Sequence, residues 1–237
     1  MILMTNRLGS EKLLPVTMSL TSVPFSLSVP TQTLSGGHGA VRTGRETIQQ
    51  RQITISGVIY DPDKDKTRQE LDSLLPFLME PPIEVYRRHT DDRCLIARLL
   101  SVPQQWVDAD AELHLSITLL ALDPYWHGPE TTEGITGTQD IEIEGTAPTL
   151  PVIRTSGSVS ALTVTNSTTG QTVTVTGLSS AGVIEIDCAN FTCTVDGENR
   201  LDLVDDDWFV DGFELWPGVN EVITTAPIEI IYRPRWY

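Results

Sequence analysis

The aspartates are the residues of this chain whose spacing most resembles that of a metal-binding site. Asp61, Asp63 and Asp65 alternate with other residues, and Asp72 follows eleven positions after Asp61, as the ligands of a calcium loop would. Such a loop needs glycine at its sixth position and usually glutamate at its twelfth, where this chain has Lys66 and Asp72. The run therefore indicates the start of a solvated helix rather than a calcium site.

A second acidic run, Asp205 to Asp207, is followed by Trp208 and could form a divalent-cation site or a sugar platform. No further ligands stand at a spacing that would complete a cation site, so a charged hairpin tip is the favoured interpretation. The four histidines lack the spacing of a metal motif, and Cys188 and Cys193 lack the second pair that structural zinc requires. The sequence predicts no metal site and no cofactor.

Motifs for nucleophilic catalysis and phosphate binding are also missing from the sequence. No serine stands in a Gly-x-Ser-x-Gly context. The stretch Gly36-Gly37-His38-Gly39 is rich in glycine but lacks the Lys-Ser/Thr of a phosphate loop. Carboxylates are plentiful, which leaves a glycosidase pair open, but nothing singles out two of them. We predict no catalytic residue and expect that the protein is not an enzyme.

Composition and charge limit the kinds of molecule that the protein is expected to bind. The 237 residues include 16 Lys and Arg against 32 Asp and Glu, a formal net charge of −16 at pH 7. Such a surface repels phosphate backbones and anionic lipids, so neither sequence-specific nucleic-acid binding nor a membrane partner is expected. The first residues lack the apolar core of a signal peptide, and the longest nearly apolar run, residues 117–122, is too short to span a bilayer. We expect synthesis in a cytoplasm and three buried, reduced cysteines.

The balance of charge changes along the chain. Residues 1–128 contain 12 basic and 15 acidic residues, a balance of −3, whereas the remainder contains 4 and 17, a balance of −13. Helical periodicity is confined to the first part, and the second is rich in Thr, Gly, Val and Ile in short alternating runs. A polar, glycine-rich stretch over 128–145 lies at the change. We therefore predict two domains, at residues 1–130 and 131–237.

The first domain is predicted to be a β-sheet with one short helix. Residues 51–60 alternate between apolar and polar side chains, and Gly57 within them indicates a bulge or a close backbone approach. Leucines at helical spacing predict a helix over about residues 63–78, with Asp61 as N-cap and an end or kink at Pro76. Further strands are expected over 83–88, 94–102 and 113–122.

A long polar loop is predicted over residues 31–47, and it contains Arg42 and Arg45. A structureless loop of this length in a compact domain is usually functional or disordered. In an assembling protein it could become ordered against a neighbouring subunit; a mobile loop without a role is the alternative.

The second domain is predicted to be an all-β sandwich. Alternating residues flank a turn over 166–170, and Asp196-Gly197 marks a second hairpin. Leu201 and Leu203 are expected to continue the strand pattern, and a turn is expected at Trp216-Pro217-Gly218. Strands at this spacing, separated by Gly and Asn or Asp, are typical of a sandwich.

The order of these features resembles one known family. A strand ITISGVIY, a leucine-rich helix and a strand that runs into Asp123-Pro124-Tyr125-Trp126 come first. An acidic sandwich follows, with Ile186-Asp187, Pro217-Gly218-x-Asn220 and the ending YRPRWY. This order is similar, over essentially the whole chain, to that of the distal tail proteins of phages with long non-contractile tails.

The resemblance implies a mainly β fold, in which an N-terminal β domain with one short α-helix precedes a C-terminal galectin-like β-sandwich. It implies a structural role in the virion, where a ring of six copies would stand at the tail tip. The N-terminal domain would join the tail tube protein to the tail-associated hub or lysin protein. The C-terminal domain would hold receptor-binding proteins or side fibres.

Two other functions stay open at the level of sequence. Trp208 and Trp216 are compatible with a carbohydrate-binding or adhesion module that contacts the host cell surface, and the many carboxylates are compatible with a cell-wall hydrolase. The terminal Trp236 and Tyr237 are expected to pack the end of the chain onto a sheet.

Four residues are candidates for the interface between ring subunits. Arg42, Arg45 and Arg51 could form ion pairs across heterologous contacts, and ordinary surface arginines are the alternative. Gly57 could permit a strand kink that shapes the ring-forming sheet.

Overall fold

The computed structural model of the chain describes residues 1–15, 17–22, 26–33, 40–43, 47–88, 91–107 and 112–237. These residues form two compact units: unit 1 comprises residues 1–126 with Tyr237, and unit 2 comprises residues 127–236. The division lies a few residues before the boundary predicted at residue 130. Both units are built mainly from β-strands, which confirms the predicted fold class.

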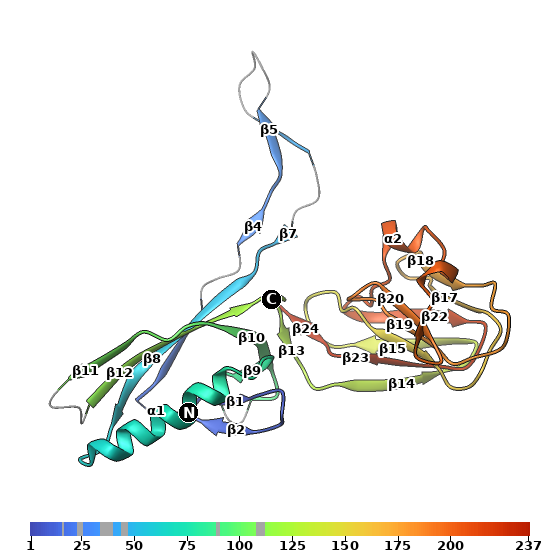
Figure 1. Cartoon of the computed structure of the whole chain (residues 1–237). Helices are drawn as coiled ribbons and strands as arrows, with labels where there is room; N and C mark the ends of the chain where they lie inside the picture. Colours follow the sequence, from blue (N-terminus) through green and yellow to red (C-terminus); the bar gives the residue numbers. More distant parts are fainter. Residues whose placement is uncertain (16, 23–25, 34–39, 44–46, 89–90, 108–111) are drawn as a thin grey trace. The chain divides into compact units, whose positions relative to one another are not determined.

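Unit 1 is a β-sheet with one helix and a two-stranded extension (Figure 1). Along the chain its elements are β1 (Leu3–Thr5), β2 (Glu11–Leu13), β3 (Ser19–Ser22), β4 (Leu27–Ser28), β5 (Thr31–Thr33), β6 (Ala40–Arg42), β7 (Thr47–Ile48), β8 (Arg51–Tyr60), α1 (Lys64–Leu78), β9 (Ile83–Tyr86), β10 (Cys94–Ser101), β11 (Gln104–Val107) and β12 (Glu112–Ala121). The strand β13 (Trp126–His127) lies where the two units meet in the sequence. The strands predicted over 51–60, 83–88, 94–102 and 113–122 are confirmed to within two residues at each end.

The main sheet of unit 1 must be curved. Its strand order is β2-β1-β9-β10-β12-β8-β3, and β11 also pairs with β12. Only six residue steps separate the end of β2, Leu13, from the start of β3, Ser19, and such a segment reaches about 21 Å. Seven flat strands would hold these two end strands about 29 Å apart. The ends of the sheet therefore approach each other, and Leu14 and Met18 of the connecting segment are buried.

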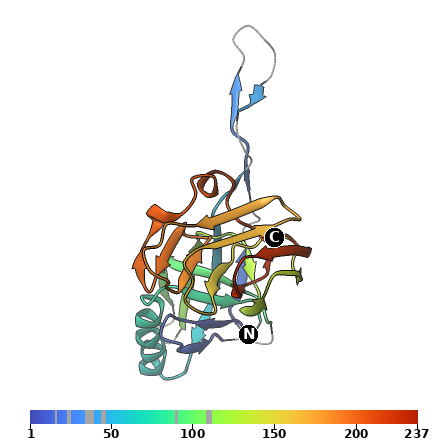
Figure 2. The same cartoon turned by 90° about the vertical axis from the view of Figure 1, so that its right-hand side faces the viewer.

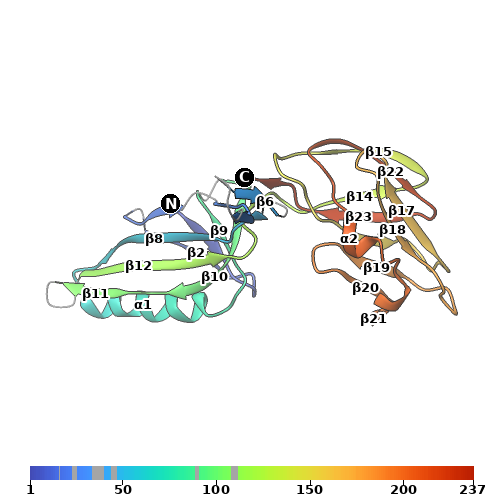
Figure 3. The same cartoon turned by 90° about the horizontal axis from the view of Figure 1, so that it is seen from above.

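The centre of the sheet is the antiparallel pair β8–β12, which is in register over ten residues from Arg51↔Ala121 to Tyr60↔Glu112. Alternate residues of both strands are buried, because successive side chains of a strand point to opposite faces. The helix α1 packs against this pair and runs along one face of the sheet (Figure 3). Leu71, Leu74 and Leu78 of α1 supply the buried stripe, so this contact forms the core of unit 1.

Two details of α1 correct the sequence-based expectation. The N-cap is Asp63 rather than Asp61: the Asp63 carboxylate accepts from the backbone N–H of Asp65 at 3.1 Å, and that of Asp61 accepts from Asp63 at 2.9 Å. Pro76 does not end the helix, which continues to Leu78. A proline this close to the C-terminal end removes a single intrahelical hydrogen bond, and burial of Phe77 and Leu78 holds the last turn in place.

The prediction of a long loop over residues 31–47 is wrong for the part of this segment that the structure describes. β5 pairs with β6 in the register Thr31↔Arg42, and β4 pairs with β7. Figures 1 and 2 show these two strand pairs one after the other along a narrow extension, which we call the ribbon (β4 to β7). Leu27 and Val29 of the ribbon are 54% and 43% exposed. An isolated two-stranded ribbon is only marginally stable in water, so a contact outside it would stabilise it.

Unit 2 is a sandwich of two antiparallel sheets. Its elements are β14 (Thr131–Ile135), β15 (Thr138–Ile143), β16 (Val152–Thr155), β17 (Leu162–Asn166), β18 (Gln171–Val175), β19 (Ile184–Asp187), β20 (Thr192–Val195), β21 (Glu198–Asn199), η1 (Leu201–Leu203), α2 (Trp208–Asp211), β22 (Gly218–Thr224), β23 (Ile228–Tyr232) and β24 (Arg235–Trp236). One sheet has the order β14-β23-β16-β19-β20-β21 and the other β15-β22-β17-β18. Inward-facing residues of both sheets, among them Ile153, Ile186, Val164 and Val222, form one core cluster.

The turns of unit 2 are partly as predicted. The hairpin β17–β18 closes with the pair Asn166↔Gln171, and Asp196-Gly197 turns between β20 and β21, as expected. Leu201–Leu203 form a short 3₁₀ turn rather than a strand, and Asp205 to Asp207 lead into the one-turn helix α2 rather than form a hairpin tip. Tertiary contacts explain both differences. A β-bridge joins Val204 to Val175, and Trp208 is fully buried, so this segment packs onto the core.

Candidate assembly surfaces

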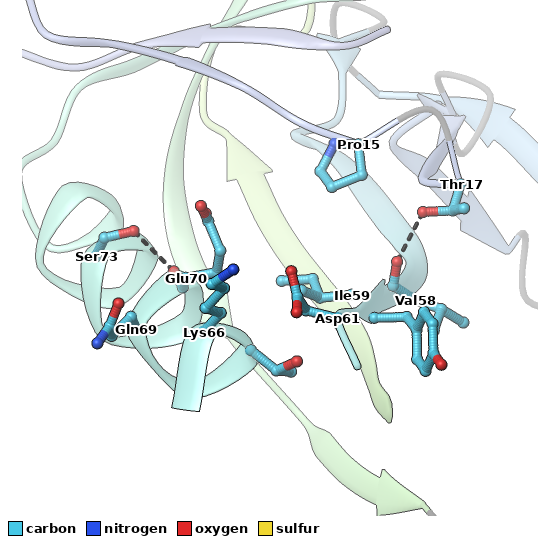
Figure 4. Close-up of a pocket in the computed structure, with 11 residues that line it drawn as sticks. Pro15, Thr17, Val58, Ile59, Asp61, Lys66, Gln69, Glu70 and Ser73 are labelled. Carbon is cyan, nitrogen blue, oxygen red and sulfur yellow. Dashed lines mark hydrogen bonds between the residues drawn. The ribbon is translucent and has the colours of Figure 1, made fainter. Parts of the chain in front are cut away.

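A hollow in unit 1 opens between the end of β8, the first half of α1 and the segment before β3 (Figure 4). Its volume is about 730 Å³. The Thr17 hydroxyl donates to the Val58 carbonyl at 2.7 Å on one wall, and the Lys12 ammonium donates to Glu70 at 3.1 Å and Ser73 at 2.8 Å on another. These bonds join the elements that form the walls, and they engage the charged groups of Lys12 and Glu70.

The face of the β8–β12 pair that does not bear the buried stripe is polar. Its side chains, in cross-strand pairs, are Thr54 with Thr118, Ser56 with Ser116, and Val58 with His114. The imidazole Nε2 of His114 lies 2.7 Å from a carboxylate oxygen of Glu112 on the same face. Most side chains of this face are partly or fully exposed, so unit 1 offers a second surface of low net charge for assembly.

The packing around position 57 explains why this residue is a glycine. The pairing of β8 with β12 runs without a bulge through Gly57↔Leu115, so of the two alternatives the structure favours close backbone approach. A Cβ at this position would lie 2.6 Å from the Met18 Cα and 2.6 Å from the Thr17 carbonyl oxygen. Glycine thus lets the chain before β3 cross directly over β8.

The arginine candidates are placed differently from one another. Arg51 is 5% exposed at the start of β8, so it is not an ordinary surface arginine. Burial, and then the positive charge of Arg87, lower the pKa of Arg51. Arg42 is the last residue of β6 in the ribbon, and Arg45 lies outside the described residues. Arg42 and Arg51 thus lie in different elements, the first in the ribbon and the second in the main sheet.

The two tryptophans considered for sugar binding differ in their exposure to solvent. Trp208 is fully buried, which excludes it as a stacking platform. Trp216 is 53% exposed in the turn before β22. Asn220 fixes this turn, because its side-chain oxygen accepts from the Trp216 N–H at 2.9 Å and its amide donates to the Trp216 carbonyl at 2.7 Å. Asn166, also buried, donates to the same Asn220 oxygen at 3.0 Å.

A cluster of apolar side chains on unit 2 was not foreseen from the sequence. We call Phe191, Phe209 and Val210 the aromatic patch; they are 40%, 43% and 79% exposed. The run Trp208-Phe209-Val210 is the signal that could have revealed it, because a single helical turn cannot bury three consecutive apolar residues.

The rings of the last two residues of the chain lie against residues that precede and follow β13. Within unit 2, the ring of Trp236 lies so close to Gly128 that a Cβ there would meet it at 2.9 Å, and Arg233 donates to the Gly128 carbonyl at 2.8 Å. Within unit 1, the rings of Tyr237 and Tyr125 meet edge to face at 5.5 Å.

The cysteines are buried free thiols, as predicted. Burial raises the pKa of Cys193 to about 11, and burial also raises that of Cys188. Among the residues that the structure describes, no group of three or more His, Cys, Asp or Glu could hold a metal ion. Within the same residues, no helix has the length and apolar character needed to cross a membrane.

Unit 2 matches a known protein family. Residues 144–236 match the family model described as siphovirus-type tail component, C-terminal domain. No curated protein is similar in sequence to the chain.

The whole chain is similar to solved structures of phage tail proteins. The crystal structure of SPP1 Dit, described as a paradigm of the hub adsorption apparatus in phages that infect Gram-positive bacteria, superposes with a TM-score of 0.74 over 100% of both chains at 18% identity. A chain of the phage p2 baseplate in its activated conformation with Ca gives a TM-score of 0.54 at 10% identity, covering 98% of this chain and 97% of that one. The same baseplate with Sr gives 0.53 at 11% identity with the same coverage. Residues 144–236 thus match the siphovirus-type tail component family, and the chain as a whole has the fold of SPP1 Dit, in agreement with the order of its motifs.

Proposed function

We propose that the chain is a structural component of a long non-contractile phage tail tip, in which six copies close head to tail into a ring. The observation that carries this proposal is the family match of residues 144–236 together with a fold that follows SPP1 Dit from end to end. In this role the protein is not an enzyme, and it acts in the virion after synthesis in the host cytoplasm.

Unit 1 is the proposed ring builder, and it joins the tail tube protein to the tail-associated hub or lysin protein. Its ribbon, its hollow beside α1 and its polar sheet face are three distinct surfaces, and a closed ring needs two different, mutually complementary surfaces on every copy. Arg42 and Arg45 are proposed to form ion pairs between subunits. Arg51 and Gly57 are proposed to shape the sheet from within.

Unit 2 is the proposed attachment point for receptor-binding proteins or side fibres, on the outside of the ring. It contains most of the excess acidic charge of the chain. Such a surface repels nucleic acid and anionic lipid, which supports protein partners rather than a sequence-specific nucleic-acid or membrane partner.

Light scattering coupled to size exclusion tests this proposal. The purified chain should form a species with about six times the mass of one copy, alone or when mixed with the tail tube protein. A chain that stays monomeric at high concentration and binds neither the tube protein nor the hub protein would contradict the proposal.

A second candidate function, a carbohydrate-binding or adhesion module, is favoured by one observation. Trp216 is half exposed, and a pair of buried amides fixes the turn that presents it; rigid aromatic side chains are suited to stacking. Binding to a glycan array or to isolated cell walls that disappears in Trp216→Ala, but persists in Phe209→Ala, would support it.

A further inference from the structure

We propose that the aromatic patch of unit 2 and the carboxylates of Asp205, Asp206, Asp207 and Asp211 form a docking site. Its occupant is a basic segment of a different protein, with arginine or lysine next to an aliphatic or aromatic side chain. This inference rests on the proposed function, in which unit 2 holds attached proteins, and it adds the place on the unit and the chemistry of the partner.

The side chains of the patch come from two separate segments of the chain. Phe191 lies in the turn between β19 and β20, and Phe209 and Val210 lie in α2. The ring centroids of Phe191 and Phe209 are 6.5 Å apart with nearly parallel planes, and both rings contact the buried Trp208, at 5.2 Å and 5.3 Å. The exposed rings are thus layered on a buried ring instead of hanging free in solvent.

The surrounding structure holds the patch rigidly. Phe191 has a φ of 51°, a left-handed conformation that is costly for a residue other than glycine. The side chain of Gln171 donates to the Asp211 carbonyl at 2.8 Å, and the backbone N–H of Asp205 donates to the Thr174 carbonyl at 3.0 Å. The last residue of α2 and the segment before α2 are thus both bonded to β18. A preorganised apolar surface loses little entropy when a partner binds.

The charge beside the patch indicates which partner fits. Residues 201–214 contain six acidic residues and no Lys or Arg. No described residue forms an ion pair with Asp205, Asp206, Asp207 or Asp211, and the nearby Arg200 is engaged by Asp202. The site therefore presents uncompensated negative charge close in the sequence to the exposed side chains of Phe209 and Val210.

A basic segment matches both properties. A guanidinium or ammonium group is attracted to the face of an aromatic ring, and guanidinium makes charge-assisted hydrogen bonds to carboxylates. Val210, 79% exposed, offers contact for a neighbouring apolar side chain. A second copy of unit 2 is a poor occupant, because its own balance of about −13 would be repelled.

Selection from a random peptide display library tests the inference on the full chain. Peptides are selected on wild-type protein and depleted on the double variant Phe209→Ser/Asp206→Asn. We expect the enriched peptides to combine Arg or Lys with an aliphatic or aromatic residue. A synthetic copy of the leading peptide should lose about tenfold in affinity with each single variant and should bind more weakly as salt is raised. Enrichment of neutral or acidic peptides, or no enrichment at all, would overturn the inference.

Two controls make the result specific. Val219→Ser and Asp140→Asn change an exposed apolar and an exposed acidic residue of the four-stranded sheet, and they should leave peptide affinity unchanged. Both patch variants alter exposed side chains, and an unchanged thermal unfolding curve checks their fold. Light scattering separates the two proposals. If the protein forms a ring but its peptide binding does not depend on the patch, only the docking site is overturned. If peptide binding depends on the patch but the protein never forms a ring, only the ring is overturned.

Discussion

Two buried amides, Asn166 and Asn220, connect the hairpin β17–β18 to the turn before β22. Both are fully buried, and together they satisfy the backbone groups of Glu214, Trp216 and Gly218. Buried polar groups of this kind are costly to leave unpaired, so the amide pair fixes where the turn lies and how Trp216 is presented.

Removal of one amide should therefore be strongly destabilising. Asn220→Ala removes the partner of the Trp216 N–H, the partner of the Trp216 carbonyl and one of the two acceptors of the Asn166 amide, and we expect a loss of about 3 kcal/mol in the free energy of unfolding. Asn199→Ala, at an exposed position, should cost less than about 1 kcal/mol. Urea unfolding of both variants measures the difference; equal losses would contradict the role assigned to the pair.

Gly57 can be tested against a matched glycine in another strand. Gly57→Ala would place a methyl group 2.6 Å from backbone atoms of Thr17 and Met18, and we expect a loss of about 3 kcal/mol, since overpacking against backbone has no easy relief. At Gly134 in β14, a Cβ would have no atom of another segment within 4 Å, so Gly134→Ala should be neutral or slightly stabilising. Thermal unfolding that shows Gly57→Ala as stable as Gly134→Ala would refute the close approach.

The buried thiol of Cys193 makes stability depend on pH at the alkaline end. Burial raises its pKa from the ordinary 9.0 to about 11 in the folded chain. The contribution of this thiol to the free energy of unfolding is fully present below pH 9, where the thiol is neutral in the folded and the unfolded chain. The contribution is lost as pH rises toward 11, because the thiol ionises first in the unfolded chain. Urea unfolding at pH 8 and pH 10.5 should show a decline that is smaller in Cys193→Ala. A decline of the same size in wild type and variant would assign it to other groups.

The ribbon is the element with the least support from its own unit. Leu27 and Val29 are exposed, and β4 to β7 pair only with one another in the described residues. Replacing residues 27–48 by a short Gly-Ser linker should leave the circular-dichroism spectrum and unfolding midpoint of the rest nearly unchanged, because β3 and β8 pair independently. The same variant should fail to form the ring in light scattering. Rings of unaltered size would remove the ribbon from the interface.

Elements with a complete local pattern could be predicted from sequence. β8 and β12 alternate over ten residues each, and the turn over 166–170 lies between two clean alternations, so their own side chains determine them. The ribbon strands and β1, β2 and β21 have only two or three residues. For such short segments the pairing partner, not the local pattern, decides the conformation.

The candidate site was harder to predict than the fold. Phe191 lies 18 positions before Phe209 in the sequence, and only the packing of the turn after β19 against α2 brings the two rings together. Trp208 and Trp216 have the same residue type and opposite exposure, because Trp208 fills the sandwich core whereas Trp216 projects from a turn. No spacing rule distinguishes the two tryptophans.

At the scale of the whole chain, the two β units differ in their charge and in the surfaces that they present. Unit 1 is nearly balanced in charge and contains the ribbon, the hollow and the polar sheet face, whereas unit 2 has most of the acidic excess and the exposed aromatic side chains. Strong like charge opposes self-association and leaves room for a partner of opposite charge. This division agrees with a ring built by unit 1 and an attachment surface on unit 2.

Negative-stain electron microscopy of the purified full chain, alone and mixed with the tail tube protein, would show the proposed assembly itself. We predict rings of about six copies with a central hole. Images that contain only single particles without a hole, at every concentration and in the presence of the tube protein, would refute a ring-forming role.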